Sequence, residues 1–246
     1  MFSESRPTQH HQYHIQLAIL LSFVAGLVNV CSILSIHRLT TNVTGHFAFF
    51  VEEILQTNYF FAFKFLLFVL FFFLGSFTSN LMVEIISTVN ARYKYTIPVI
   101  LEALLLFICG GAFTIYSFNY PDLIAIVLLF SMGLQNSLVT RVSNSVVRTT
   151  HLTGIFTDLG IEVSQLLFIK NKIKKTKVKL SIQLKLTIIT CFTIGGLLGG
   201  FVYSWIGLRT LWIAVSVLLV AAFLNNIKRQ LLKFSQFTTI IKEETS

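Results

Sequence analysis

Thr40-Thr41-Asn42-Val43-Thr44-Gly45-His46-Phe47 returns later in the chain as Thr149-Thr150-His151-Leu152-Thr153-Gly154-Ile155-Phe156. Five of the eight positions are identical, and the two segments lie 109 positions apart (Thr44 to Thr153). A match of this length at a fixed distance indicates an internal duplication, in which one structural unit occurs twice.

The sequence on either side of the two segments repeats as well. Gly26-Leu27-Val28-Asn29 precedes the first segment, and Gly133-Leu134-Gln135-Asn136 precedes the second. Glu53 and Glu162 follow at the same distance of 109 positions. Matches in the same order and with nearly the same spacing predict two related halves.

The composition predicts a membrane protein. Of the 246 residues, 54% are hydrophobic and only 12% are charged. A soluble domain of this size would need more charge on its surface, whereas long apolar runs with few charges are typical of polytopic membrane proteins. The net charge of +9 does not indicate nucleic-acid binding, because the basic residues lie between the apolar runs, where membrane orientation explains them.

Six apolar runs are long enough to cross a bilayer, which takes about 20 residues each. A polar tail (1–14) comes before them, and a basic, amphipathic segment (226–246) follows. The two halves span 15–117 and 121–225, with a Lys-rich loop (170–183) in the second half. The predicted spans are 15–36, 60–87, 96–117, 121–140, 184–205 and 207–225.

Two shorter apolar segments, 44–56 and 153–169, are either half-length helices that enter and leave on one side or full spans. The positive-inside rule favours half-helices, because six spans place more lysines and arginines in the cytoplasm than eight would. Both termini are then cytoplasmic. Three crossings per half turn the second half upside down, as in the inverted repeats of transporters and channels.

Thr44-Gly45 and Thr153-Gly154 are expected at the starts of the two half-helices. A threonine there caps the helix, and the free backbone N–H groups offer a partial positive charge to a ligand. Two such starts meeting from opposite leaflets would form a polar site at mid-membrane. The alternative is that both motifs only cap and pack the half-helices.

The acidic residues of the half-helices are the candidates for coupling to a proton or ion, because charge at membrane depth is costly and usually functional. Asp158 and Glu162 share a helical face, and we expect Asp158 to matter most. If the half-helices are shallow, Glu52, Glu53 and Glu162 are solvated ends. The predicted substrate-binding residues are Asn29, Thr44, Gly45, His46, Gln135, Asn136, Thr150, His151, Thr153 and Gly154; the predicted coupling residues are Asp158, Glu162 and Glu53.

The sequence gives no sign of an enzyme, a metal site or a cofactor. Cys31, Cys109 and Cys191 lie inside apolar runs without metal-ligand spacing, and catalytic motifs are missing. The expected partners are the bilayer, with anionic lipid at the Lys-rich loop and C-terminal segment, a small solute or ion, and a second copy of the chain. Nucleic acid is not expected.

The repeated motifs resemble the YoaK-like family, a widespread family of bacterial multi-spanning membrane proteins classed as a domain of unknown function. The resemblance rests on the segments 26–29, 42–45, 132–136 and 149–159 and covers about 15–225. It implies an integral inner-membrane protein for which transport is the usual expectation. Family members commonly carry Asp where Asn29 stands and Asn where His46 stands, which moves any coupling role onto Asp158.

The function we expect is passage of a small solute or ion, by a secondary transporter or a channel. The first alternative is a membrane scaffold or accessory subunit without transport. A lipid-modifying enzyme is a third class, which the sequence supports least.

Overall fold

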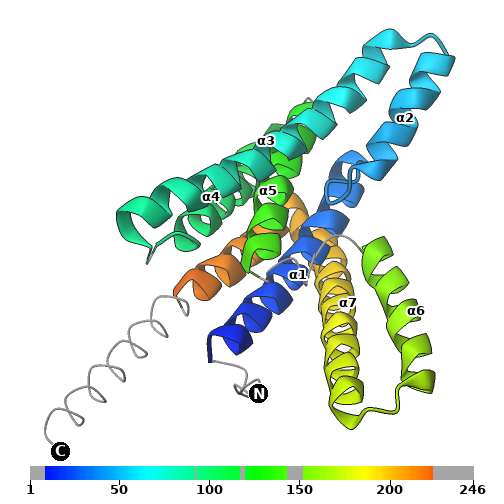
Figure 1. Ribbon diagram of the computed structural model, residues 1–246. Helices are drawn as coiled ribbons and strands as arrows, with labels where there is room; N and C mark the ends of the chain where they lie inside the picture. Colours follow the sequence, from blue (N-terminus) through cyan, green and yellow to red (C-terminus); the bar gives the residue numbers. More distant parts are fainter. Residues whose placement is uncertain (1–8, 92, 117–119, 143–151, 224–246) are drawn as a thin grey trace, which may run out of the picture.

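The computed structural model describes residues 9–91, 93–116, 120–142 and 152–223, and within these ranges every regular element is a helix (Figure 1). This agrees with the predicted all-α class. A helical stretch, 211–223, follows the last named element. The elements are α1 (Gln9–Ile36), α2 (Thr44–Leu55), α3 (Tyr59–Asn90), α4 (Thr96–Tyr116), α5 (Pro121–Val142), α6 (Leu152–Phe168), α7 (Lys172–Ile206) and the 3-10 helix η1 (Gly207–Thr210).

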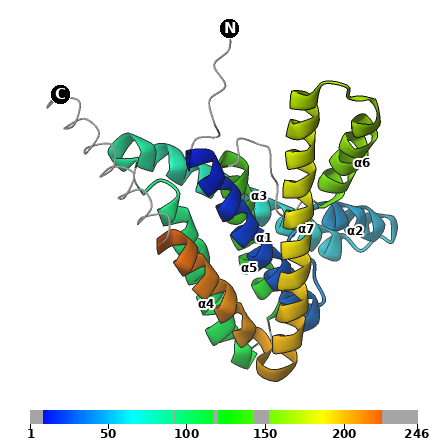
Figure 2. The same cartoon turned by 90° about the horizontal axis from the view of Figure 1, so that it is seen from below.

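Four described segments are long and apolar enough to cross a membrane: Ile19–Ile36, Tyr59–Asn90, Pro121–Arg141 and Lys172–Phe223. The chain is therefore a multi-pass membrane protein. The last segment contains the predicted span 184–205 and most of the predicted span 207–225. It folds back on itself at η1 (Figure 2). The described apolar part of α4, Thr96–Gly111, is shorter. The total of six spans stays a prediction.

The reversal at η1 depends on Gly207. Its φ of +61° lies in the left-handed region, which glycine enters without the steric penalty of a Cβ atom. The Tyr203 carbonyl accepts the Gly207 N–H and ends α7. The chain then returns as 211–223, where the Trp212 ring stacks on Phe107 of α4 with ring centroids 5.6 Å apart.

α1 and α7 touch backbone to backbone. A Cβ atom built on Gly26 would lie 1.9 Å from the Phe192 carbonyl oxygen, and one built on Gly195 would lie 2.1 Å from the Phe23 carbonyl oxygen. Only glycine permits such an approach, as in other close-packed membrane helices. Farther along, Gly199 meets Leu27, so residue numbers rise together and the two helices run parallel.

α3 and α5 form a second contact of the same kind. A Cβ atom on Gly75 would lie 2.0 Å from the Phe130 carbonyl oxygen, and one on Gly133 would lie 2.1 Å from the Phe72 carbonyl oxygen. These helices also run parallel, because an ion pair joins them at each end. The pairs are Lys64 with Asp122, at 2.5 Å, and Glu84 with Arg141.

α1 and α5 form the centre of the bundle, and α3 lies at its edge. In the apolar segments of α1 and α5 that could cross a membrane, 56% and 61% of the residues are buried. In that of α3 only 22% are buried. The Gln135 amide of α5 donates to the Leu21 carbonyl of α1 and joins the two central helices. Most of the phenylalanines of α3 are exposed, as expected for a lipid-facing surface.

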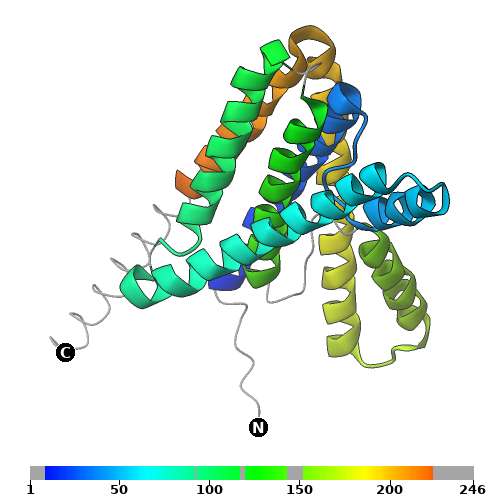
Figure 3. The ribbon, with the colours of Figure 1, turned by 90° about the horizontal axis from the view of Figure 1, so that it is seen from above.

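The two short helices each form a hairpin with the helix that follows. α2 packs along α3, and α6 packs along α7. Figure 3 shows the closed ends of the hairpins pointing in different directions from the bundle. The starts of α2 and α6 lie at the ends opposite to these closed ends, and their predicted meeting at one polar site stays a prediction.

Candidate functional site

A cavity of about 520 Å³ lies where the chain turns into α2, and we call it the α2 cavity. Three elements line it: the turn before α2, the middle of α3, and the second half of α5. Polar side chains dominate the lining, and none of the lining residues is acidic. The lining residues are Thr41, Asn42, Val43, Thr44, Phe72, Ser76, Asn80, Asn136, Ser137, Thr140 and Arg141.

The turn between α1 and α2 is fixed to the end of α1 by side-chain hydrogen bonds. The Thr41 hydroxyl donates to Asn29 Oδ1 at 2.8 Å, and the Thr40 hydroxyl donates to the Ser32 hydroxyl at 3.0 Å. Ser32 in turn donates to the Arg38 carbonyl at 2.9 Å. Asn29, predicted to bind substrate, does not line the α2 cavity. It holds the cavity wall in place.

α2 starts differently from the predicted threonine cap. The helix begins at Thr44, the capping position is Val43, and Val43 makes no side-chain cap. Asn42 Oδ1 instead accepts the Gly45 N–H at 3.3 Å. The Thr44 side chain is consequently not used as a cap, and Thr44 lines the cavity beside the positive end of α2.

His46 points away from the α2 cavity. It is buried, and its ring packs against Phe65 and Phe68 with ring centroids 6.1 and 5.4 Å away. Its Nε2 lies 2.7 Å from the Leu39 carbonyl oxygen, and because a carbonyl only accepts, Nε2 donates. The predicted role of His46 in substrate binding has no support from this placement. Its ring anchors the turn instead.

Gln135 and Asn136 are adjacent in sequence but face different neighbours. Asn136 lines the α2 cavity together with Ser137, while Gln135 is fully buried against α1. One residue along an α-helix turns the side chain by about 100°, which accounts for the split. Of the predicted substrate-binding residues, Thr44 and Asn136 are brought together at the cavity.

The second motif lies only partly within the described part of the chain. Thr150 and His151 lie outside the described part of the chain. α6 begins at Leu152, so Thr153 already belongs to its first turn, where it is exposed and its carbonyl accepts the Thr157 hydroxyl at 3.0 Å. Gly154 is half-buried and does not line the α2 cavity.

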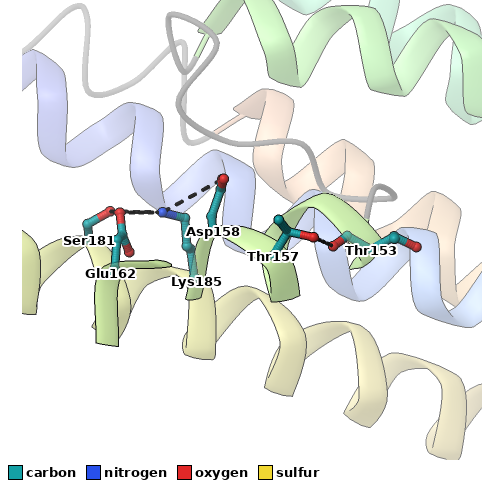
Figure 4. A network of polar contacts seen from close by, with 6 residues as sticks. All are labelled: Thr153, Thr157, Asp158, Glu162, Ser181 and Lys185. Atoms are coloured by element: carbon teal, nitrogen blue, oxygen red, sulfur yellow. Dashed lines mark hydrogen bonds and ion pairs between the residues drawn. The ribbon is translucent and has the colours of Figure 1, made fainter. Parts of the chain in front are cut away.

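The predicted coupling acids of α6 are paired with a lysine of α7 (Figure 4). Lys185 Nζ lies 2.6 Å from Glu162 Oε1 and 3.9 Å from Asp158 Oδ2. The Ser181 hydroxyl donates to the same Glu162 oxygen at 2.7 Å, and Lys185 donates to Ser181 at 3.1 Å. We call these four residues the Lys185 cluster.

The charged side chains of the Lys185 cluster differ in how deeply they are buried. The side chains of Lys185 and Glu162 are 9% and 19% exposed, whereas that of Asp158 is 58% exposed. Glu162 therefore holds the buried ammonium, and Asp158 lies at the exposed rim of the cluster. This weakens the expectation that Asp158 is the leading residue of the pair.

Sequence reasoning placed Lys185 among the basic residues of the cytoplasmic loop and missed its pairing. A signal was present: Lys185 lies in the apolar run from Leu184 to Ile189, where a cation needs a partner. Glu53, the third predicted coupling residue, lies in the other hairpin. Its Oε2 is buried without a hydrogen-bond partner in the described part of the chain.

Comparison with known proteins gives a family and a relative. Residues 17–224 match the model of the family described as "Protein of unknown function (DUF1275)". The UPF0700 transmembrane protein YoaK of Bacillus subtilis (strain 168) is 28% identical over 178 residues, which is 72% of this chain and 79% of that protein. No solved structure matches the chain.

Proposed function

This chain belongs to the DUF1275 family of unknown function, and from that premise we propose that it moves a small polar solute across the membrane. The α2 cavity is the binding site in this proposal. The observation that carries it is a group of polar side chains gathered around one hollow between apolar helices, because polar groups at membrane depth are costly and are usually kept for function.

The lining of the α2 cavity suits a neutral or anionic solute. Hydroxyl and amide groups offer both donors and acceptors, and the α2 N-terminus adds a partial positive charge. The lining contains no carboxylate that would attract a cation, and its one cation, Arg141, is paired with Glu84. A sugar, an alcohol or a small monoanion has the matching chemistry.

The helix contacts support two inverted repeats. In each half, the first helix makes a close glycine contact with one helix of the other half. That partner is the helix that follows the other half's short helix. These are the parallel pairs α1 with α7, and α5 with α3. A two-fold rotation that exchanges the halves converts one pair into the other. Gly26 lies in the first pair, and Gly133, at the matching sequence position, lies in the second.

The position of the α2 cavity supports a transport role for this arrangement. Thr41 to Thr44 come from the first half, and Asn136 to Arg141 come from the second. A movement of one half against the other would change the cavity's shape and its access to either side. Transporters with inverted repeats bind substrate at such interfaces.

The experiment is solute uptake into proteoliposomes with a matched pair of variants. Thr44→Val removes a cavity hydroxyl, and Thr157→Val removes an exposed α6 hydroxyl that bonds only to its own helix. A solute found by thermal stabilisation of the wild type should lose its uptake in Thr44→Val and Asn136→Leu and keep it in Thr157→Val.

The same experiment addresses the scaffold alternative. A scaffold or accessory subunit has no need of the cavity, so both cavity variants would fold and co-purify with a partner as the wild type does. Uptake at wild-type rates in both cavity variants would contradict a transport role for this site.

A further inference from the structure

Glu102 in α4 is a fully buried acid that sequence analysis did not single out. Its exposed fraction is 0%, and neither carboxyl oxygen has a hydrogen-bond partner in the described part of the chain. It lies two turns into a helix that begins at Thr96. The neighbouring positions on its face of α4, Val99, Ala103 and Leu106, are buried and apolar.

Among the described residues, the elements that pack against α4 bring no free charge to Glu102. α4 packs on α5, on η1 and the stretch 211–223 that follows it, and over a shorter length on α3; the stretch 211–223 contains no titratable side chain. The charged residues of α5 and α3 pair with each other as Lys64 with Asp122 and Arg141 with Glu84.

The remaining titratable groups lie toward the ends of α4. The η1 turn, which carries Arg209, meets α4 at Gly110, more than two turns beyond Glu102. Ahead of α4, Lys94 lies over the ring of Tyr95, with Nζ 4.8 Å from the ring centroid. Cys109, the other titratable side chain described on α4, is buried and neutral as a thiol.

An ionised carboxylate in these surroundings would have lost its water without gaining a partner, which costs several kcal/mol. Glu102 is therefore a neutral acid in this conformation, and its proton stays until water reaches it. A metal cation is a poor fit, because a hard cation takes about six oxygen ligands and the adjacent α4 side chains offer none. A proton is the one cation that a lone carboxyl holds.

We propose that Glu102 is a proton-carrying site, loaded in this conformation and emptied when α4 separates from α5. The proposal rests on the transport function proposed above, because α5 also carries the cavity residues Asn136 to Arg141. The same movement would open the cavity and expose the acid. Proton release and solute access are then linked through one helix contact.

The first test is labelling with dicyclohexylcarbodiimide, an apolar reagent for protonated carboxyls. The acid O–H adds across one C=N bond to give an O-acylisourea, and acyl transfer to nitrogen gives a stable N-acylurea, so the adduct keeps every atom of both reactants. In native membranes we expect this mass on the Glu102 peptide, and at least tenfold less of it at pH 9 than at pH 6. Glu102→Gln should remove it.

The matched control is Glu162, whose carboxyl is held by Lys185 and Ser181 and should stay unlabelled. Labelling of Glu102 that sodium ions suppress would overturn the proposal in favour of a cation site. An unlabelled Glu102 would also overturn it, since a carboxyl that never becomes accessible in the folded protein carries no proton.

A second measurement does not depend on reagent access. A carboxyl that is neutral when folded and ionised when unfolded makes the folded protein bind one more proton, so stability falls as pH rises above about 4.3. Between pH 5 and pH 8, Tm of the wild type should fall more than Tm of Glu102→Gln. Parallel curves of Tm against pH for the two proteins would contradict the conclusion that Glu102 is neutral in the folded protein. Neither test uses a solute, so the outcome is separate from that of the uptake experiment.

Discussion

The α2–α3 and α6–α7 hairpins derive from matching sequence but are held together by different chemistry. In the first, buried His46 packs against Phe65 and Phe68. In the second, Lys185 is held by Glu162 and Ser181. A contact between uncharged rings has no charge for salt to screen, while an ion pair depends on the protonation of both partners.

This difference bears on what each hairpin can do. The aromatic hairpin gives the α2 cavity a wall held by ring packing, in which His46 Nδ1 and Glu53 Oε2 are buried without a hydrogen-bond partner among the described residues. The ionic hairpin stores two opposite charges in apolar surroundings, which separate only if each finds water or a new partner. The two hairpins therefore differ in how strongly their packing depends on charge.

The largest effect is expected at the aromatic contact. Phe68→Ala removes a side chain that is 1% exposed and leaves a hole between α2 and α3, which should cost about 4 kcal/mol of unfolding free energy. Chemical denaturation in mixed micelles measures it. The loss should be the same at pH 6 and pH 8. Phe73→Ala, 60% exposed on the same helix, is the control and should cost far less.

The next effect tests the ionic hairpin. Lys185→Met leaves Glu162 nearly buried without its partner, and we expect a loss of about 3 kcal/mol. Glu162→Gln in the same chain should recover much of it, because the charge that lost its partner is gone. Lys177→Met, at an exposed position, is the matched control. If the double variant is as unstable as the single one, the pair is not what holds α6 to α7.

A smaller effect is expected at His46. His46→Phe keeps the ring packing but removes the donor to the Leu39 carbonyl, which should cost about 1–2 kcal/mol. Thermal unfolding of the purified protein measures it. Because the turn before α2 would loosen, ligand affinity at the α2 cavity should fall as well. Unchanged stability together with unchanged affinity would contradict the anchoring role.

Sequence predicted the helices well and the partners poorly. The apolar runs located α3, α4 and α5 within a few residues, whereas α7 begins at Lys172, inside the predicted Lys-rich loop and well before the predicted span 184–205. Two of the predicted binding residues, Thr44 and Asn136, line one cavity. These features are local, or they follow from the duplication. Lys185 and Glu162 are separated by 23 positions, and only the α6–α7 packing brings them together.

The start of α2 shows another limit of sequence reasoning. Asn42 and Thr44 are both good capping residues, and the choice between them depends on the turn geometry after α1. The capping side chain is that of Asn42, two residues before the predicted Thr44, and Thr44 lines the cavity instead. Glu102 was hidden for a related reason: within an apolar run, one acid gives no indication of whether it is buried or solvated.

The smallest effect is expected at Asp158, the residue that sequence reasoning favoured for coupling. Its side chain is 58% exposed and 3.9 Å from Lys185, so solvent screens the pair and Asp158→Asn should cost less than about 0.5 kcal/mol. Uptake measured at two pH values separates structure from coupling. If Glu102 carries the proton, Asp158→Asn keeps the wild-type pH dependence of uptake and Glu102→Gln loses it. The opposite result would return the coupling role to α6 and make the ionic hairpin itself the proton-sensitive element.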